Sequence, residues 1–392
     1  MPITPVQPKP ITILRSGELL NLARTSSRKK LKQQIYPAEF FSPGHSDKLC
    51  DAIADRLVDE AVQRDGRSLC EIEVVVENAN VSVRGTISSA GARDIDRAAI
   101  VRDVYASAGY GERYPDPAEL DIHEELGLFP QIEVENPPPP VYGQCVVAGY
   151  ANDLPGTNYL PPEQWIAYRL MRQLMLLREQ ESDLVLGPAG DVLVLFDAAQ
   201  NQLAGLCISV QPCYPRNIPA LSRAMRGLLP TELELVATDI PGFNPIVPED
   251  FVVNFDAIGP AENRGMSGRR VVADTYGPRV PICGSQLSGT DLFDTYRAGV
   301  ILARCIAKSV VFCEGVKECL TTLVLVPGET EFRIVSIRDS DAKALNTSRW
   351  SKRFDLSVQS VGAAYARSAR LAECGLYGHF TEPNRPWEYR DL

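Results

Sequence analysis

The chain has 392 residues, of which 45% are hydrophobic and 23% are charged. This length suits two or three domains, and this composition is typical of a soluble globular protein. The formal net charge of −10 argues against a broad nucleic-acid-binding surface. No apolar run reaches the roughly 18 residues needed to cross a bilayer. We therefore expect small-molecule partners, with neither nucleic acid nor a membrane.

The ten cysteines are scattered along the chain without a C-x-x-C pair. In a chain of this length, the pattern is typical of reduced thiols rather than of a disulfide framework or a zinc site. We therefore predict a cytoplasmic protein.

Residues 1–34 form a segment of distinct composition, with four prolines near its start and a basic run at 28–32. It lacks the apolar core of a secretory signal. We predict a partly disordered N-terminal extension. A docking arm for a partner subunit and an organellar transit peptide are the alternatives.

The first predicted helix begins at Gly44–Lys48 and carries apolar residues at helical spacing until Asp65 and Gly66 stop it. Two strands follow at 71–77 and 81–88, joined by a turn at 78–80. A second helix is predicted from Asp94 to about Ala108. The order helix, hairpin, helix indicates an α+β layer.

The middle of the chain starts with an irregular connector, 111–143, that ends in four consecutive prolines. A helix over 161–180, a hairpin of 191–196 with 203–210, and a helix from Pro219 follow. A hairpin followed by a helix thus recurs, which suggests three similar layers. We divide the chain into an N-terminal domain at 35–140, a central domain at 141–255 and a C-terminal domain at 256–392. These boundaries are approximate, and we expect the domains to be interleaved.

The segment Gly44–Lys48 places a histidine, an acid and a lysine at a helix N-terminus, where backbone N–H groups and the helix dipole favour an anion. Asp47 could hold Mg²⁺ while His45 and Lys48 contact phosphate oxygens. The alternative is that His45 only caps the helix or lies on the surface.

A second candidate is the glycine-rich loop at 259–268, which is followed by Arg269 and Arg270. Two arginines beside flexible backbone suit a phosphate chain, because a guanidinium binds phosphate with two parallel hydrogen bonds. A plain surface loop with solvated arginines is the alternative.

Three blocks together resemble one known family, the S-adenosylmethionine synthetases. Gly44-His45-Ser46-Asp47-Lys48, followed by Asp51, is similar to the family signature GHPDK-x-x-D. Residues 268–277, GRRVVADTYG, resemble its GRK-hydrophobic-x-x-DTYG loop, and 377–380 with 386–388 resemble its YGHF and PWE. The blocks occur in family order, residues 149–151 fit an intermediate block, and the resemblance covers about 36–390.

The resemblance implies an α+β fold of three interleaved domains, with a pseudo-threefold arrangement of mixed sheets. It implies a reaction in which the sulfur of methionine attacks the 5′ carbon of ATP and the triphosphate leaves, to be split into pyrophosphate and phosphate. It also implies Mg²⁺, K⁺, and a homodimer or dimer of dimers with active sites between subunits.

Carried over residue by residue, the resemblance implies a set of site residues. The expected catalytic residues are His45, Arg269 and Arg270, and the expected metal ligands are Asp47 for Mg²⁺ and Glu73 for K⁺. The expected nucleotide-binding residues are His45, Lys48, Phe255, Asn263, Arg269, Arg270 and Gln286.

The sequence departs from the family at seven aligned positions. Three family lysines fall on Asp191, Thr290 and Asp294. Four family acids fall on Thr86, Gly143, Asn263 and Tyr296. Replacing a lysine by an acid beside a polyphosphate costs several kcal/mol unless it is compensated, about 4 kcal/mol per close charge pair at an effective dielectric of about 20.

Three interpretations follow from this mixture of retained and altered positions. The chain is an adenosyltransferase that makes S-adenosylmethionine or a close analogue, or an enzyme on the same scaffold with another nucleotide or nucleophile. The third interpretation is a non-catalytic regulatory subunit that pairs with a true synthetase. Family resemblance does not decide among them, because function depends on the site.

Overall fold

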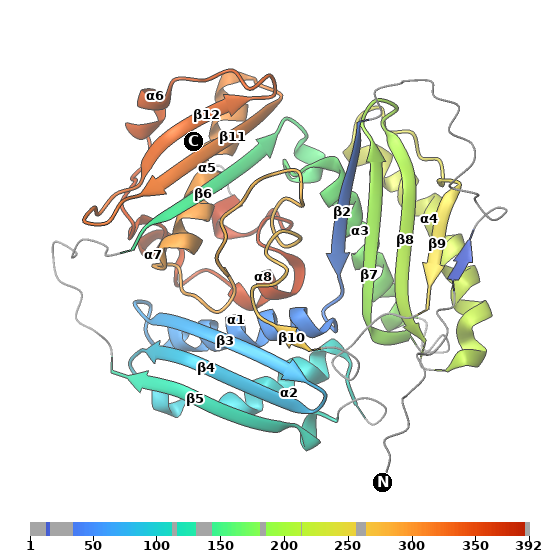
Figure 1. Cartoon of the computed structure of the whole chain (residues 1–392), viewed down its shortest axis with the longest axis horizontal. Coiled ribbons are helices and arrows are strands. Elements are labelled where there is room, and N and C mark those ends of the chain that lie inside the picture. The colour runs from blue at the N-terminus through green and yellow to red at the C-terminus, as the bar shows by residue number, and fades with distance from the viewer. Residues whose placement is uncertain are drawn as a thin grey trace, which may run out of the picture.

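The computed structural model describes residues 13–15, 34–111, 116–130, 143–180, 186–212, 214–255 and 264–388. Within these residues the chain forms three β-sheets, each covered on one face by helices (Figure 1). The predicted α+β class is confirmed.

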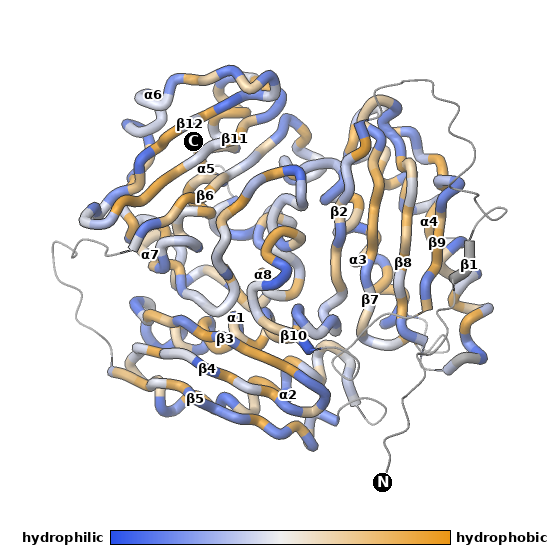
Figure 2. Tube along the Cα trace, viewed as in Figure 1, coloured by the Kyte–Doolittle hydropathy of each residue, from blue (hydrophilic) through white to orange (hydrophobic). Residues whose placement is uncertain are grey.

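The first sheet has five strands in the order β1-β9-β8-β7-β2. In that order the strands are Ile13–Arg15, Asp250–Asn254, Gln202–Pro212, Leu186–Asp197 and Ile35–Phe41. Helix α3 (Pro162–Gln180) packs on β2 and β7, and helix α4 (Ile218–Asp239) contributes to the same hydrophobic core. Figure 2 shows the continuous apolar character of β7 and β8.

The second sheet has four strands in the order β10-β3-β4-β5. In that order they are Gly265–Met266, Leu69–Glu77, Asn80–Ser88 and Asp121–Phe129. Helices α1 (Ser46–Arg64) and α2 (Arg97–Ala108) lie against the buried face of this sheet. The hairpin of β3 and β4 was predicted from alternation and is confirmed.

Strand β5 lies within the segment 111–143, which was predicted to be irregular, so that prediction is wrong for Asp121–Phe129. It pairs in parallel with β4 at the edge of the sheet, and none of its residues is fully buried. Its apolar residues Ile122, Leu126 and Leu128 are partly buried against the core. Glu124 interrupts their alternation, so the apolar pattern is too short to predict a strand.

The third sheet has three strands in the order β12-β11-β6, which are Arg333–Asp339, Glu318–Leu325 and Cys145–Asn152. Helix α5 (Thr295–Glu314) packs on β6 and β11. Three short helices complete the chain: α6 (Thr347–Ser351), α7 (Ser360–Tyr365) and α8 (Leu371–Tyr377). Single 3₁₀ turns occur at Ala92–Asp94, Pro117–Glu119, Pro155–Thr157, Pro215–Asn217 and Pro386–Glu388.

The three sheets exchange strands that are distant in sequence. Strand β2 joins β7 in the first sheet, β10 joins β3 in the second, and β6 joins β11 in the third. The predicted interleaving is therefore confirmed. The boundaries at residues 140 and 255 stay a prediction, because the sheets exchange strands across them.

Helix α1 is buried on nearly all sides. Fifteen of its nineteen residues are buried, so it cannot lie on a surface as an amphipathic helix does. It contacts β3 and β10 of the second sheet, and helix α8 packs against it (Figure 1). Gly375 of α8 meets the backbone of Asp51, where a side chain would collide.

Four aspartates recur every fourth residue along α1, which places them on one side of the helix. Each carboxylate accepts a hydrogen bond from the backbone N–H of a distant segment. The pairs are Asp47 with Met266, Asp51 with Gly268, Asp55 with Gly289, and Asp59 with Leu371 and Ala372. We call these four residues the aspartate ladder. The ladder attaches three distant segments of the chain to a single helix.

Two buried ion-pair clusters involve α5. Arg297 donates two hydrogen bonds to Asp55, at 2.6 and 3.0 Å, and both side chains are completely buried. Arg304 and Lys308 both bind Glu388, which lies in the C-terminal PWE block. These buried contacts give Glu388 a structural role.

None of the helices within the described ranges is both long and apolar enough to cross a membrane. The nine described cysteines form no disulfide. Cys213 lies outside the described residues.

Removing the charge of Asp55 should destabilise the fold strongly. In Asp55→Asn the amide can still accept from Gly289, but Arg297 keeps a buried charge without a counter-ion, which costs about 3–5 kcal/mol. We expect a loss of that size in the free energy of unfolding, measured by urea denaturation.

The matched control is Glu60→Gln on the same helix, which breaks a partly exposed pair with Arg64. Such pairs contribute about 0–1 kcal/mol. A loss below about 1 kcal/mol in Asp55→Asn, or equal losses in both variants, would contradict the importance of the ladder.

Candidate active site

His45 is the N-cap residue of α1 and is only 6% exposed. Its Nδ1 accepts a hydrogen bond of 3.1 Å from the backbone N–H of Asp47. Burial, then the positive charge of Arg270, lowers the pKa of His45 to about 4. At neutral pH the ring is therefore uncharged, and its hydrogen is on Nε2. This N–H group can donate a hydrogen bond to a ligand.

Asp47 lies in the first turn of α1, two residues after His45, and is 1% exposed. Its Oδ1 accepts from the backbone N–H of Met266 at 3.0 Å. Its Oδ2 accepts from Nε of Arg270 at 2.7 Å. Arg269 approaches Oδ1 at 3.8 Å. The carboxylate therefore fixes the loop that carries both arginines.

The two arginines differ in freedom. Arg270 lies over the ring of Phe41 at 4.1 Å, which adds a cation–π contact to its bond with Asp47. The side chain of Arg269 is 46% exposed, and Nη1 donates to the carbonyl of Arg264. Arg270 is thus held in place, whereas Arg269 can reach a ligand. We call His45, Asp47, Arg269 and Arg270 the cradle.

Gly268 sets the direction of these arginines. Its φ is +80°, and a side chain there would collide with Gln286. Its N–H donates to Asp51 at 2.7 Å. The amide of Gln286 in turn donates to the carbonyl of Ile72 at 3.2 Å. Gln286 therefore lies immediately beside the arginine loop.

Lys48 lies in the first turn of α1, and its positive charge contributes to the lowered pKa of His45. It is completely buried and forms an ion pair with Asp274, the aspartate of the DTYG block. Burial raises the pKa of Asp274 to about 6, against the lowering effect of Lys48. The backbone carbonyl of Asp274 accepts from the N–H of His379 at 2.7 Å. Lys48 thus links the three sequence blocks, and its contact with a nucleotide stays a prediction.

Two of the remaining predicted residues lie on or next to the sheets, and their roles stay predictions. Glu73 is exposed on β3, on the face opposite the hydrophobic core. Phe255 is 5% exposed within the core of the first sheet. Asn263 lies outside the described residues.

Asp191 faces the same space as Arg270. It pairs with Phe41 across β7 and β2, and the ring of Phe41 lies under Arg270. Burial raises the pKa of the Asp191 carboxyl, while a hydrogen bond from Ser209 and the charge of Arg270 lower it. An acid therefore lies near the cradle where the family has a lysine.

The other altered positions have local partners. Thr290 is 6% exposed, and its hydroxyl donates to the carbonyl of Leu287. Asp294 is the N-cap of α5 and accepts from the backbone of Tyr296 and Arg297. The Tyr296 hydroxyl donates to the carbonyl of Gln144 at 3.2 Å. These side chains now stabilise their own segments.

The donor set does not fit a Mg²⁺ ion held by this chain. Among the described residues, no group of three or more His, Cys, Asp or Glu side chains is arranged around a possible ion. Both oxygens of Asp47 are hydrogen-bonded, one of them to Arg270, which a cation would have to displace. Tyr296 replaces the second family carboxylate, and its hydroxyl is engaged elsewhere.

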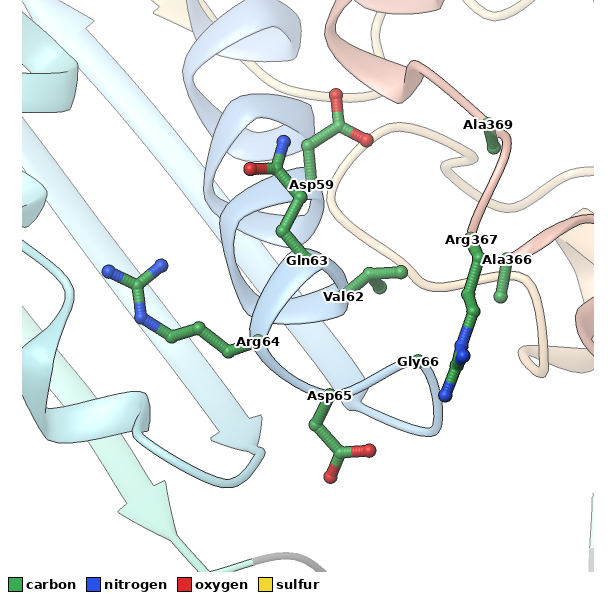
Figure 3. A pocket seen from close by; sticks show the side chains of 9 residues that line it. All are labelled: Asp59, Val62, Gln63, Arg64, Asp65, Gly66, Ala366, Arg367 and Ala369. Atoms are coloured by element: carbon green, nitrogen blue, oxygen red, sulfur yellow. The ribbon is translucent and has the colours of Figure 1, made fainter.

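A separate cavity of about 440 Å³ lies at the C-terminal end of α1 (Figure 3). The helix itself is about 28 Å long at 1.5 Å per residue. It is bounded by Val62 of the helix and by Arg367 of the segment before α8. Asp59 lies at its edge and accepts from two backbone N–H groups; burial raises its pKa to about 6. The cavity is not part of the cradle.

Two features of the site could not be assigned by comparison of motifs alone. The contact of Phe41 with Arg270 joins strand and loop residues that are far apart in sequence, so no local pattern predicts it. The ladder, in contrast, has a signal in the sequence, because aspartates recur every fourth residue at 47, 51, 55 and 59.

His45 should remain uncharged over the neutral range. The chain has three histidines, so each imidazole can be assigned in NMR spectra. We expect His45 to show no titration between pH 8 and 5.5, because its pKa is lowered to about 4. Arg270→Gln should raise that pKa, since one lowering charge is removed. A His45 midpoint near the ordinary value of about 6.5 would contradict this assignment.

Comparison with known proteins agrees with the motifs. Residues 33–125 match the N-terminal domain of S-adenosylmethionine synthetase, and residues 258–389 match its C-terminal domain. The chain is 28% identical to the S-adenosylmethionine synthase of Aquifex aeolicus, over 90% of this chain and 95% of that protein. It is 26% identical to the enzyme of that name from Mycoplasma pneumoniae, over 90% and 93% of the two chains. The chain belongs to the S-adenosylmethionine synthetase family.

Proposed function

We propose that this protein is an adenosyltransferase that joins the adenosyl group of ATP to the sulfur of methionine or a close analogue. The sulfur lone pair attacks the 5′ carbon, the bond from that carbon to the phosphate oxygen breaks, and triphosphate leaves. Water then splits triphosphate into pyrophosphate and phosphate. The observation that carries this proposal is the convergence of His45, Arg269 and Arg270 at the N-terminus of α1.

The cradle suits a departing anion. The Nε2–H group of His45 donates a hydrogen bond to an oxygen without adding charge, because the pKa of the ring is about 4. The N-terminus of α1 adds the positive end of a helix dipole. Both groups are held in position before the ligand arrives, so little reorganisation is needed as negative charge develops.

The arginines supply the positive charge. Arg269 is exposed enough to bind phosphate with two parallel hydrogen bonds, and Arg270 is fixed by Asp47 and Phe41. K⁺ at Glu73 remains a prediction from the family. Mg²⁺ at Asp47, also expected from the family, is not supported by the hydrogen-bonded oxygens of that side chain. A divalent ion in such enzymes neutralises phosphate charge.

A second candidate function keeps the scaffold and changes the nucleotide. The observation in its favour is Asp191, whose carboxyl lies near Arg270. This acid repels a triphosphate at close range. A substrate with fewer phosphate charges, or with a hydroxyl that the carboxylate can accept from, would suit the site better.

We also expect a homodimer or a dimer of dimers, because family active sites lie between two subunits. Light scattering after size-exclusion chromatography measures the mass in solution. A monomer at micromolar concentration would contradict this expectation.

The proposed reaction is tested with the purified chain, ATP, methionine and Mg²⁺. Mass spectrometry detects S-adenosylmethionine, and ³¹P NMR identifies the phosphates released. Arg269→Gln should lower the rate about 10- to 100-fold, since a hydrogen bond to a charged group contributes about 1.5–3 kcal/mol. Arg64→Gln at the far end of α1 is the control and should change nothing.

The two candidate functions are separated by Asp191→Lys. If ATP is the substrate and the acid only weakens its binding, the variant should bind tripolyphosphate at least about tenfold more tightly, because repulsion becomes attraction. Asp191→Asn should have an intermediate effect. Unchanged affinity in folded variants would show that Asp191 does not face the phosphates.

A further inference from the structure

The oxygens of Asp47 that a metal ion would use are already occupied. Nε of Arg270 lies 2.7 Å from Oδ2, and the backbone of Met266 binds Oδ1. Arg270 is therefore a positive group within hydrogen-bond distance of the carboxylate that would serve as the metal ligand. It lies where a cation would otherwise neutralise Asp47.

Arg270 is also immobilised from a second direction. The ring of Phe41 lies 4.1 Å from its guanidinium carbon, and Asp191 lies near enough for the arginine to lower the pKa of that carboxyl. An arginine held by Asp47 and an aromatic ring loses little further freedom when it binds a ligand. The two terminal NH₂ groups have no partner among the described residues that would prevent phosphate binding.

We propose that the cradle binds the phosphate chain of its ligand without a divalent cation, with Arg270 and Arg269 in place of the metal charge. The inference rests on the proposed function only for the place where phosphates bind. It does not depend on turnover.

This arrangement has a direct consequence for binding. A phosphate chain complexed with Mg²⁺ presents less negative charge to the arginines than the free chain does. If the arginines provide the attraction, adding Mg²⁺ leaves the affinity unchanged or weakens it. If Asp47 instead holds Mg²⁺, adding the ion strengthens binding.

The test is isothermal titration of the full chain with inorganic tripolyphosphate, once in EDTA and once in excess Mg²⁺. We expect binding in EDTA, with an affinity in Mg²⁺ that is equal within about threefold or weaker. Binding that is more than about tenfold tighter in Mg²⁺ would overturn the inference.

Two variants assign the effect to residues. Arg270→Gln should weaken binding in EDTA by about tenfold or more, because a charged hydrogen bond is lost. Arg270→Lys keeps the charge and should lose less. Equal affinity in the parent and in Arg270→Gln, with circular dichroism showing a folded variant, would overturn the role of Arg270.

Asp47→Asn tests the metal directly. The amide oxygen can still accept from Met266, so the loop keeps that contact. We expect the ratio of affinities in Mg²⁺ and in EDTA to be the same in this variant as in the parent. A ratio that changes by tenfold or more would show that Asp47 holds a cation and would overturn the inference.

The outcomes separate this inference from the proposed function. Binding only in Mg²⁺ overturns the inference and leaves the adenosyltransferase proposal intact. Binding in EDTA without any product in the activity assay supports the inference and contradicts that proposal. Absence of tripolyphosphate binding in both conditions overturns both, because the cradle would then not be a phosphate site.

Discussion

The rest of the structure depends on the aspartate ladder of α1. A helix buried on nearly all sides needs polar partners that are satisfied without water, and its four aspartates find them in the backbones of distant segments. Because the four carboxylates accept from three distant segments, the helix sets the position of the arginine loop, the turn before α5 and the start of α8. The pairing of Asp55 with Arg297 extends this attachment to α5 itself.

Asp47 belongs both to the cradle and to the aspartate ladder, of which it is the first residue. Asp47 binds Met266 and Asp51 binds Gly268, so alternate residues of the loop attach to successive turns of the helix. With Gly268 in a left-handed conformation, the chain turns there and presents Arg269 and Arg270 beside His45. The same hydrogen bonds that stabilise the core therefore determine the direction of the charged side chains. Stability and anion binding share one set of contacts.

The altered family positions fall into two physical groups. Asp191 changes the electrostatics of the cradle, since it adds a second acid beside Arg270. Thr290, Asp294 and Tyr296 have acquired hydrogen-bond partners in their own segments. The first group bears on the charge around Arg270. In the second group, Asp294 and Tyr296 stabilise the start of α5.

The sequence by itself determined the family, the hairpins, the long helices and the retained residues of the cradle, because each depends on a local pattern or a contiguous motif. Strand β5 was not predicted because Glu124 interrupts the apolar residues of its partly buried face. Only the tertiary structure decided that Lys48 is buried against Asp274, and that Phe41 and Asp191 lie beside Arg270. These contacts join residues separated by about 80 to 230 positions, and such contacts are set by the packing of whole elements. The charge that a ligand meets therefore follows from the assembled fold.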